Sequence, residues 1–298
     1  MTGIYPAVMT GYDVHGDVSI PRTLDLVDRL LQSGVHGLFI GGTAGEGPLQ
    51  SVDERKELAT AIMRHVDGAV PVISHVGALP FRDTLELARH ARANGVGRVA
   101  AIPPLYYAMS VPEVADYFRA LAAALGEPVM AYHVPHLTHR AAPASWLAGL
   151  AREGVIDGVK FSADDLAEIQ AVIEQSRGTR FTLLSGSDPL CMASALVGSA
   201  GAVGVSINAM PGTFVRLWDA VAAGDLTTAA ELQRIVSRFV THMFGYNFIA
   251  YLRHVLARQG VDVGPNRIPL PNLTPEDERD IDGVLDADPD LRAALGLA

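Results

Sequence analysis

An eightfold alternation of short β-branched runs with longer amphipathic segments constrains the fold of this chain most. The amphipathic segments, such as TLDLVDRLLQS and VPEVADYFRALAAAL, carry apolar residues at helical spacing. Strands that alternate with helices are typical of parallel βαβ units, and eight such units close a barrel. We therefore predict an α/β protein with a TIM (β/α)8 barrel. The predicted strands are Ile4 to Met9, Gly37 to Ile40, Val70 to His75, Arg98 to Ile102, Val129 to His133, Ile156 to Phe161, Phe181 to Leu184 and Ala202 to Ser206.

An open doubly wound sheet is the alternative architecture. It is disfavoured because the first strand is followed by TGYDVHG, which lacks the glycine-rich turn of dinucleotide-binding folds. After the eighth unit the pattern changes to helices alone, as in TTAAELQRIVSRFVTHMF and NFIAYLRHVLARQG. We therefore expect a barrel catalytic domain over residues 1–224 and a helical C-terminal domain over residues 225–298.

Composition narrows the function classes. The 298 residues are 49% hydrophobic and 19% charged, which fits a globular protein with a sizeable core. A net charge of -10 argues against nucleic acid or an anionic membrane surface as the main partner. No apolar run reaches a bilayer-spanning length, the N-terminus has no basic region followed by an apolar one, and the single cysteine, Cys191, fits a reducing compartment. These features predict a cytoplasmic protein.

The placement of Lys160 points to chemistry. The chain has only two lysines, and Lys160 lies in the apolar run Ile156 to Phe161, at the end of a predicted strand. The other, Lys56, lies on the polar face of a predicted helix capped by Ser51 and Glu54. In a βα barrel the carboxyl ends of the strands form the face on which active sites are built. An exposed lysine at a strand end is the ordinary alternative, which the apolar flanks disfavour.

A buried lysine amine can act as a nucleophile. Lysine rather than arginine is needed where the nitrogen must lose its proton and attack. Burial favours the neutral amine, which adds to a carbonyl and forms a Schiff base. The resulting iminium stabilises a carbanion on the adjacent carbon, so that a C–C bond can be made or broken. Tyr132, at the end of the preceding strand, is a candidate proton shuttle, and a tyrosine that only packs is the alternative.

The second predicted strand ends in GGTAGEG. Its glycines allow a tight turn and a close approach to a ligand, while its amides and the Thr43 hydroxyl can face an anion such as a carboxylate. The same letters fit a G-x-nucleophile-x-G elbow centred on Thr43. That hydrolase alternative lacks a designated histidine and acid, and it leaves Lys160 unexplained.

Three histidines, His133, His136 and His139, stand at three-residue spacing in YHVPHLTH. The spacing could suggest a metal site, but Pro135 prevents a helical face and no carboxylate or cysteine joins the group. We expect one pocket-lining histidine, His133 or His136, and an exposed His139.

The motifs, taken in order, resemble a known family: the pyruvate-dependent class I aldolases and lyases that include N-acetylneuraminate lyase and dihydrodipicolinate synthase. The resemblance implies a barrel with a helical C-terminal domain, a homotetramer, and no metal or cofactor beyond a covalent Schiff base between Lys160 and a 2-oxo acid, pyruvate. The matching pieces are GGTAGE (41 to 46), HVGAL (75 to 79), PPLYY (103 to 107), AYHVPHLT (131 to 138), GVKFS (158 to 162), GSD (186 to 188) and GAVGVSIN (201 to 208).

The resemblance also implies residue roles. Tyr132 would shuttle protons and orient the substrate carboxylate, and Thr43 would relay protons between Tyr132 and Tyr106, which reaches the site of a neighbouring subunit. Ser162 is expected to line the pocket and to cap the next helix together with Asp165. Asp188 is either a hydroxyl contact or a loop residue. Substrate contacts are expected at Gly42, Ala44, Ser162, Gly186, Asp188, Val205, His133 and Leu137, with Leu105, Tyr107 and His136 near the mouth.

Several residues differ from the family's motifs and limit the range of substrates that we expect. Leu137 replaces the arginine with which the synthases hold a carboxylate, so the lyase branch is favoured. Ala44 replaces the family's second threonine in the glycine loop. The lyases' Asp-Glu pair for sugar hydroxyls reads Asp188-Pro189, and a serine of theirs reads Val205. We predict a lyase or aldolase acting on pyruvate and a less hydroxylated aldehyde, aromatic or with a short polar chain. A hydro-lyase or synthase of the same family and a catalytically retired binding protein are the alternatives.

Overall fold

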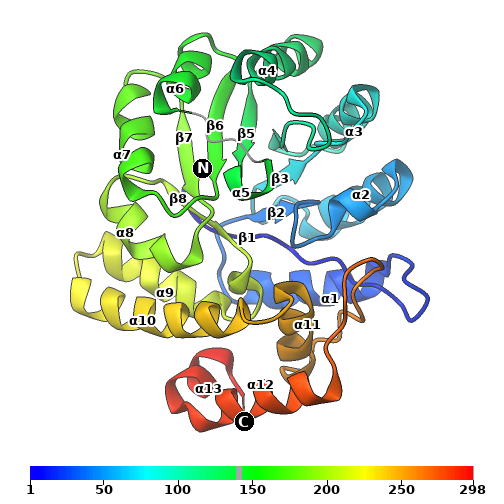
Figure 1. Ribbon diagram of the computed structural model, residues 1–298, viewed down its shortest axis with the longest axis vertical. Coiled ribbons are helices and arrows are strands. Elements are labelled where there is room, and N and C mark those ends of the chain that lie inside the picture. The colour runs from blue at the N-terminus through cyan, green and yellow to red at the C-terminus, as the bar shows by residue number, and fades with distance from the viewer. Residues whose placement is uncertain (139–142, 298) are drawn as a thin grey trace.

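The computed structural model describes residues 1–138 and 143–297 and contains one ring of eight parallel strands surrounded by helices (Figure 1). The strand order is β1-β8-β7-β6-β5-β4-β3-β2. Between β1 and β2 the ring closes through a parallel bridge of Ala7 with Phe39, beside which the Val8 amide donates to the Phe39 carbonyl at 2.9 Å. The predicted TIM barrel is therefore confirmed, and the open sheet is excluded. The strands are β1 Gly3–Pro6, β2 Leu38–Ile40, β3 Val72–His75, β4 Arg98–Ala101, β5 Val129–His133, β6 Ile156–Phe161, β7 Thr182–Ser185 and β8 Gly201–Gly204.

Helices cover the outside of the barrel and continue beyond its last strand. None of those in the described part of the chain is long and apolar enough to cross a membrane. Their bounds are α1 Ile20–Gln32, α2 Val52–Val66, α3 Phe81–Ala93, α4 Val111–Leu125, α5 Pro135–Thr138, α6 Ala144–Arg152, α7 Leu166–Gln175, α8 Cys191–Leu196, α9 Pro211–Ala222, α10 Leu226–Met243, α11 Phe248–Arg258, α12 Pro275–Ala287 and α13 Pro289–Leu295.

Three strands end earlier than the sequence predicts: β4 by one residue, at Ala101, and the first and last strands by more. The first stops at Pro6 instead of Met9, whose amide donates to the side chain of Asn208 at 3.4 Å. The last stops at Gly204, because a short 3-10 helix begins at Ser206, whose amide and hydroxyl both donate to Asp188. At the ends of these two strands, the backbone amides of Met9 and Ser206 donate to side-chain oxygens instead of to the carbonyls of a neighbouring strand.

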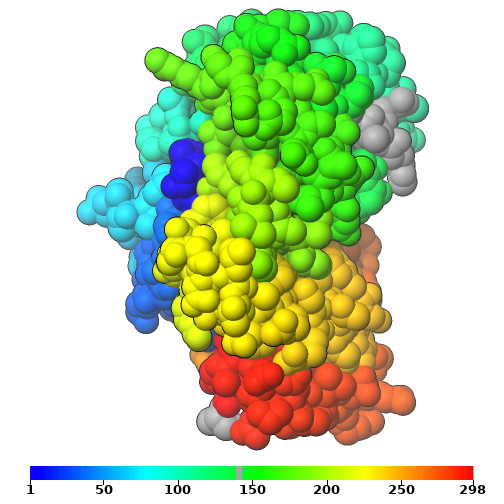
Figure 2. Space-filling view, turned by 90° about the vertical axis from the view of Figure 1, so that its left-hand side faces the viewer, coloured from blue at the N-terminus to red at the C-terminus, as the bar shows by residue number. Residues whose placement is uncertain are grey.

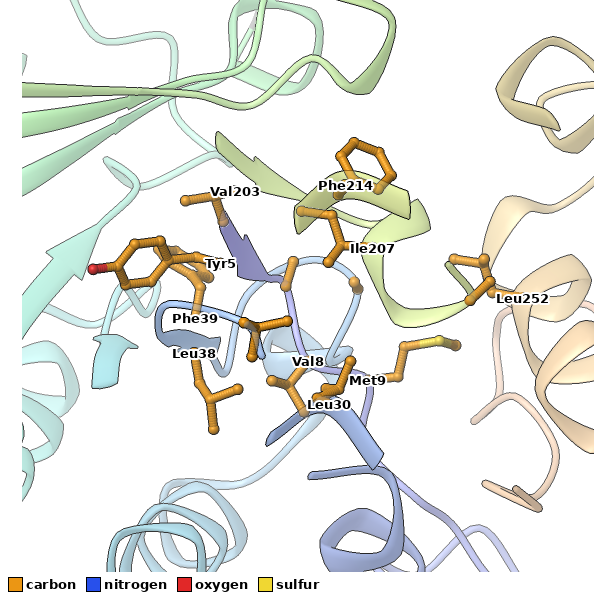
Figure 3. Close-up of a cluster of buried hydrophobic side chains, with 14 of the residues drawn as sticks. Tyr5, Val8, Met9, Leu30, Leu38, Phe39, Val203, Ile207, Phe214 and Leu252 are labelled. Carbon is orange, nitrogen blue, oxygen red and sulfur yellow. The ribbon is translucent and has the colours of Figure 1, made fainter. Parts of the chain in front are cut away.

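One hydrophobic cluster runs from the barrel into the C-terminal helices. Figure 3 shows Tyr5, Phe39 and Val203 of the strands on one side of this cluster and Phe214 of α9 and Leu252 of α11 on the other, and all five side chains are buried. The cluster continues through α12 and α13, which gather at one end of the molecule (Figure 2). The division at residue 224 falls in the link between α9 and α10 and stays a prediction.

Arg253 of α11 ties the C-terminal helices to the barrel. Its guanidinium donates to Glu46 Oε1 at 2.5 Å, to the carbonyls of Thr10 and Val263 at 2.9 and 2.6 Å, and to Asn266 Oδ1 at 2.9 Å. The side chains of Arg253 and Glu46 are 5% and 0% exposed. A buried ion pair of this kind becomes costly when one partner is removed, because the other charge stays buried without compensation.

We therefore expect Arg253→Met to lower the free energy of unfolding by about 3 to 5 kcal/mol, measured by urea denaturation. The matched control is Arg22→Ala, which breaks the half-exposed pair of Arg22 with Asp262 and should cost less than about 1 kcal/mol. Equal losses in the two variants would contradict the importance given to the buried pair.

Candidate active site

Lys160 and Tyr132 lie side by side inside the barrel. They end neighbouring strands, β6 and β5, and are paired in the register of the parallel ladder. Lys160 is only 3% exposed, and its Nζ lies 4.2 Å from the centroid of the Tyr132 ring and 4.4 Å from that of Phe39. Its surroundings are therefore largely aromatic, whereas Lys56 is ion-paired with Asp53 and Glu86 at the surface.

The Tyr132 phenol is set up to exchange a proton. Burial by itself would raise the pKa of Tyr132, but the positive charge of Lys160 and hydrogen bonds with Thr43, Lys160 and Ser162 hold the pKa below its ordinary value. The Thr43 hydroxyl lies 3.3 Å from Tyr132 Oη. Lys160, Tyr132 and Thr43 thus form one connected group of amine, phenol and hydroxyl.

His75, at the end of β3, supports this group as a neutral imidazole. Burial and the positive charge of Arg55 lower the pKa of His75 to about 3. Its Nε2 accepts a hydrogen bond from the Ile102 amide at 3.2 Å, so Nδ1 carries the proton and donates to the Gly41 carbonyl at 3.0 Å. The ring stands edge-on to Tyr132, with centroids 5.8 Å apart. His75 therefore holds the start of the glycine loop against the tyrosine.

The glycine loop is held in one conformation from several sides. Gly41 has a φ of 70°, and a Cβ on Gly47 would lie 2.1 Å from the Gly41 carbonyl oxygen, so glycine is required at both positions. The Thr10 hydroxyl and the Gln50 amide both donate to the Gly45 carbonyl, at 2.7 and 2.8 Å. Together with the Glu46–Arg253 pair, these contacts fix where the Thr43 hydroxyl points.

A cavity of about 560 Å³ opens above this group, and we call it the Lys160 cavity. Most of the predicted site residues meet there. Its walls come from the ends of the barrel strands and from α10 and α11. The predicted residues that line it are Thr43, Tyr132, Leu137, Lys160, Ser162, Gly186, Asp188 and Val205, joined by His136. Gly42 and Ala44 are buried in the glycine loop and are not part of the lining.

His133 does not face the Lys160 cavity. It follows Tyr132 on β5, and successive side chains of a strand point to opposite faces, so His133 packs outside the barrel with its ring centroid 4.8 Å from that of Phe161. There it lines a separate, small cavity together with Tyr107. Burial lowers the pKa of His133 to about 4. Its predicted contact with substrate is therefore corrected, and of the two candidate histidines it is His136 that lines the site.

The predicted mouth residue Leu105 and the predicted relay residue Tyr106 also lie elsewhere in the single chain. Leu105 and Tyr106 line a pocket between the ends of β2, β3 and β4, away from Lys160. Tyr106 is 78% exposed and stands edge-on to Tyr107, with ring centroids 5.2 Å apart. The relay from Thr43 to Tyr106 stays a prediction that requires a second subunit.

Ser162 lines the cavity but does not cap α7. Asp165 is the cap, accepting a hydrogen bond from the Glu168 amide at 2.9 Å. The Ser162 amide instead donates to the His133 carbonyl at 2.8 Å, which prolongs the pairing of β5 with β6, so the chain turns only after Ser162. A Cβ atom on residue 186 would lie 1.9 Å from the Ser162 hydroxyl oxygen. Only glycine therefore fits at the start of the GSD segment.

Asp188 is a buried structural acceptor at the cavity floor. Its Oδ2 accepts from the Ser206 hydroxyl at 2.6 Å and from the Ser206 amide at 2.9 Å. Burial raises the pKa of Asp188 even though these two donors and Lys160 oppose the shift. His139 lies outside the described residues, and within the described residues no three histidine, cysteine or carboxylate side chains are grouped to hold a metal ion.

Several residues that shape the site have weak signals in the sequence. His75 could have been found, because it ends a predicted strand within HVGAL and strand ends face the site. Phe39 is an ordinary core residue by its pattern, and Phe244, just after α10, and Phe248, at the start of α11, stand more than eighty residues downstream of Lys160. Only the folded chain brings these aromatic rings to the lysine.

Fold and site together define a class of protein: a (β/α)8 barrel with a buried lysine and a tyrosine at the carboxyl ends of adjacent strands. The chain belongs to the dihydrodipicolinate synthetase family, whose model matches residues 1–287. The family predicted from the motifs is thus confirmed.

Individual relatives cover nearly the whole chain. The N-acetylneuraminate lyase of Mediterraneibacter gnavus is 31% identical, with 92% of this chain and 88% of the lyase aligned. The putative 2-dehydro-3-deoxy-D-gluconate aldolase YagE of Escherichia coli is 32% identical over 93% of this chain and 92% of the aldolase. The crystal structure of YagE in complex with pyruvate superposes with a TM-score of 0.91, at 29% identity and 96% and 98% coverage of the two chains. A catalytic lysine mutant of Ruminococcus gnavus sialic acid aldolase gives 0.92, at 29% identity and 99% and 97% coverage.

The buried neutral His75 makes stability depend on pH. Its pKa is about 3 in the folded state and near 6.5 when unfolded, so between these values the unfolded chain binds a proton that the folded chain does not. The contribution of His75 is present above pH 6.5 and is lost as the pH falls toward 3, at up to about 1.4 kcal/mol per pH unit. In urea denaturation from pH 7 to 4.5, we expect the stability difference between the parent and His75→Gln to shrink as the pH falls. A difference that stays constant or widens would contradict the neutral assignment.

Proposed function

We propose that this protein is a class I aldolase or lyase that joins or cleaves pyruvate and an aldehyde through a Schiff base on Lys160. The observation that carries the proposal is the buried Lys160 amine, set between two aromatic rings and beside a phenol of lowered pKa. The faces of the two rings are electron-rich and would stabilise the positive charge of an iminium formed on this nitrogen.

The residues can carry each proton of the reaction. The Lys160 amine adds to the keto carbon of pyruvate, and the keto oxygen leaves as water after taking protons through Tyr132. The iminium then releases a methyl proton and becomes an enamine. The enamine carbon bonds to the aldehyde carbon while the aldehyde oxygen takes a proton, which Tyr132 and Thr43, 3.3 Å apart, can supply. Water finally hydrolyses the new iminium and restores Lys160, and cleavage is the same sequence in reverse.

The pyruvate carboxylate would bind at the glycine loop. The loop offers the Thr43 hydroxyl and backbone amides beside Tyr132. Ala44 stands where the family carries a second threonine, which removes one hydrogen bond to a charged group, worth roughly 1.5 to 3 kcal/mol. We therefore expect pyruvate binding to rest on Thr43, Tyr132 and the loop amides, with no metal or further cofactor.

The aldehyde differs from that of N-acetylneuraminate lyases. Pro189 and Val205, which line the Lys160 cavity, stand where the lyases carry polar contacts to sugar hydroxyls. A less hydroxylated aldehyde is therefore the proposed partner. The protein would act in the cytoplasm as a homotetramer, without nucleic acid or membrane partners.

Reduction of a pyruvate adduct tests the proposal. Incubation with pyruvate and sodium borohydride should add one reduced pyruvyl group, located on Lys160 by peptide mass spectrometry. Lys56→Ala removes the other lysine, which is ion-paired at the surface, and should trap like the parent. Lys160→Ala should not trap. A parent chain without an adduct would support the retired binding protein, and a live adduct that yields only a dehydrated keto acid would support the hydro-lyase.

Replacement of the phenol tests the proton shuttle. Tyr132→Phe keeps the ring against Lys160 but removes the hydroxyl, so we expect the aldol rate constant kcat to fall by roughly 10² to 10⁴. Steady-state kinetics would measure it, and circular dichroism would show that the fold is retained. A kcat within about threefold of the parent would rule out Tyr132 as the shuttle.

A further inference from the structure

The outer half of the Lys160 cavity is walled by apolar side chains from the C-terminal helices and the barrel loops. Phe244, just after α10, and Phe248, at the start of α11, have ring centroids 5.9 Å apart with an interplanar angle of 56°. Phe244 is 60% exposed although it lines the cavity. We call the following set the apolar wall: Leu137, Pro189, Val205, Val240, Phe244 and Phe248. Single exposed apolar residues are common, but their gathering around a cavity that contains a buried lysine amine points to a ligand.

Several polar groups next to this wall are already engaged with one another, while Asp188 Oδ1 is buried and has no hydrogen-bond partner among the described residues. The Ser187 hydroxyl donates to Asp164 Oδ1 at 2.6 Å, and Asp188 Oδ2 accepts both donors of Ser206. A sugar-like aldehyde would have to leave its water hydrogen bonds and compete with these internal pairs. The remaining polar side chains of the outer half, His136 and Thr241, are exposed at the rim. Burial of hydroxyls in this half would therefore be poorly compensated.

We infer that the apolar wall binds the body of an aromatic or branched apolar aldehyde, whose carbonyl carbon points to the pyruvate enamine on Lys160. The inference rests on the proposed function and adds the substrate class to it. A cavity of about 560 Å³ has room for a pyruvyl group at its polar floor and a ring-sized group beyond it. Phe244 and Phe248 can pack edge-on or offset against such a ring, and burial of its apolar surface supplies the binding free energy.

Condensation of pyruvate with matched aldehydes tests the inference. Benzaldehyde and isobutyraldehyde represent the apolar class and erythrose the polyhydroxylated class, with the aldol product measured chromatographically. We expect kcat/KM for benzaldehyde to exceed that for erythrose by at least roughly tenfold. Phe244→Ala and Phe248→Ala should each lower kcat/KM for benzaldehyde by roughly tenfold, and Phe→Leu should restore part of it. Leu226→Ala is the matched control, because Leu226 is an exposed apolar residue at the other end of α10.

Borohydride trapping with pyruvate tests the Schiff-base function independently of the aldehyde class. In the two phenylalanine variants it should proceed as in the parent, since the wall contacts the aldehyde and not the pyruvyl group. If trapping succeeds but kcat/KM for erythrose equals or exceeds that for benzaldehyde, the inference is overturned and the proposed function is retained. An altered oligomeric mass of Phe244→Ala without a change in aldehyde preference would make the wall a subunit contact and would also overturn it. Absence of trapping in the parent would refute the proposed function and the inference together.

Discussion

The burial of the Lys160 amine between aromatic rings determines how the rest of the site is built. A lysine side chain is rarely buried without a carboxylate partner, because its ammonium loses hydration. Here the Nζ lies 4.2 and 4.4 Å from the ring centroids of Tyr132 and Phe39, which supply an electron-rich surface in place of an ion pair. The barrel makes this possible: adjacent parallel strands place Tyr132 and Lys160 in register, and the bridge that closes the ring brings Phe39 to them.

A surrounding network of hydrogen bonds holds this arrangement in place. His75 stays neutral and joins the Gly41 carbonyl to the β4 end, while the buried Glu46–Arg253 pair anchors the other end of the glycine loop to α11. The C-terminal helices thus contribute twice. They stabilise the loop that carries Thr43, and through Phe244 and Phe248 they form the outer part of the cavity. Changes in the helical segment can therefore reshape the outer part of the cavity while the arrangement around Lys160 is kept.

Much of the fold and part of the site could be predicted from the sequence, for reasons that particular residues make plain. The β5 and β6 strands have the predicted bounds, because their β-branched runs end at sharp turn signals, and the strand ends carry Tyr132 and Lys160. The predicted contact of His133 with substrate is wrong, although side chains alternate along a strand and this alternation puts His133 on the opposite face from Tyr132. Ser162 is a residue type that often caps helices, but its amide donates to the His133 carbonyl and so extends the β5–β6 ladder. The engagement of Asp188 with Ser206 and the approach of Phe244 to the cavity are tertiary contacts with no local pattern.

We propose that Lys160 converts pyruvate into an enamine, and exchange of the pyruvate methyl protons in D2O measures that step without any aldehyde. Proton NMR should show loss of the methyl signal in the presence of the parent protein and of Lys56→Ala, with the exchange abolished in Lys160→Ala and slowed in Tyr132→Phe. Exchange that persists in Lys160→Ala, or that is missing from a folded parent protein, would rule out an enamine formed on Lys160.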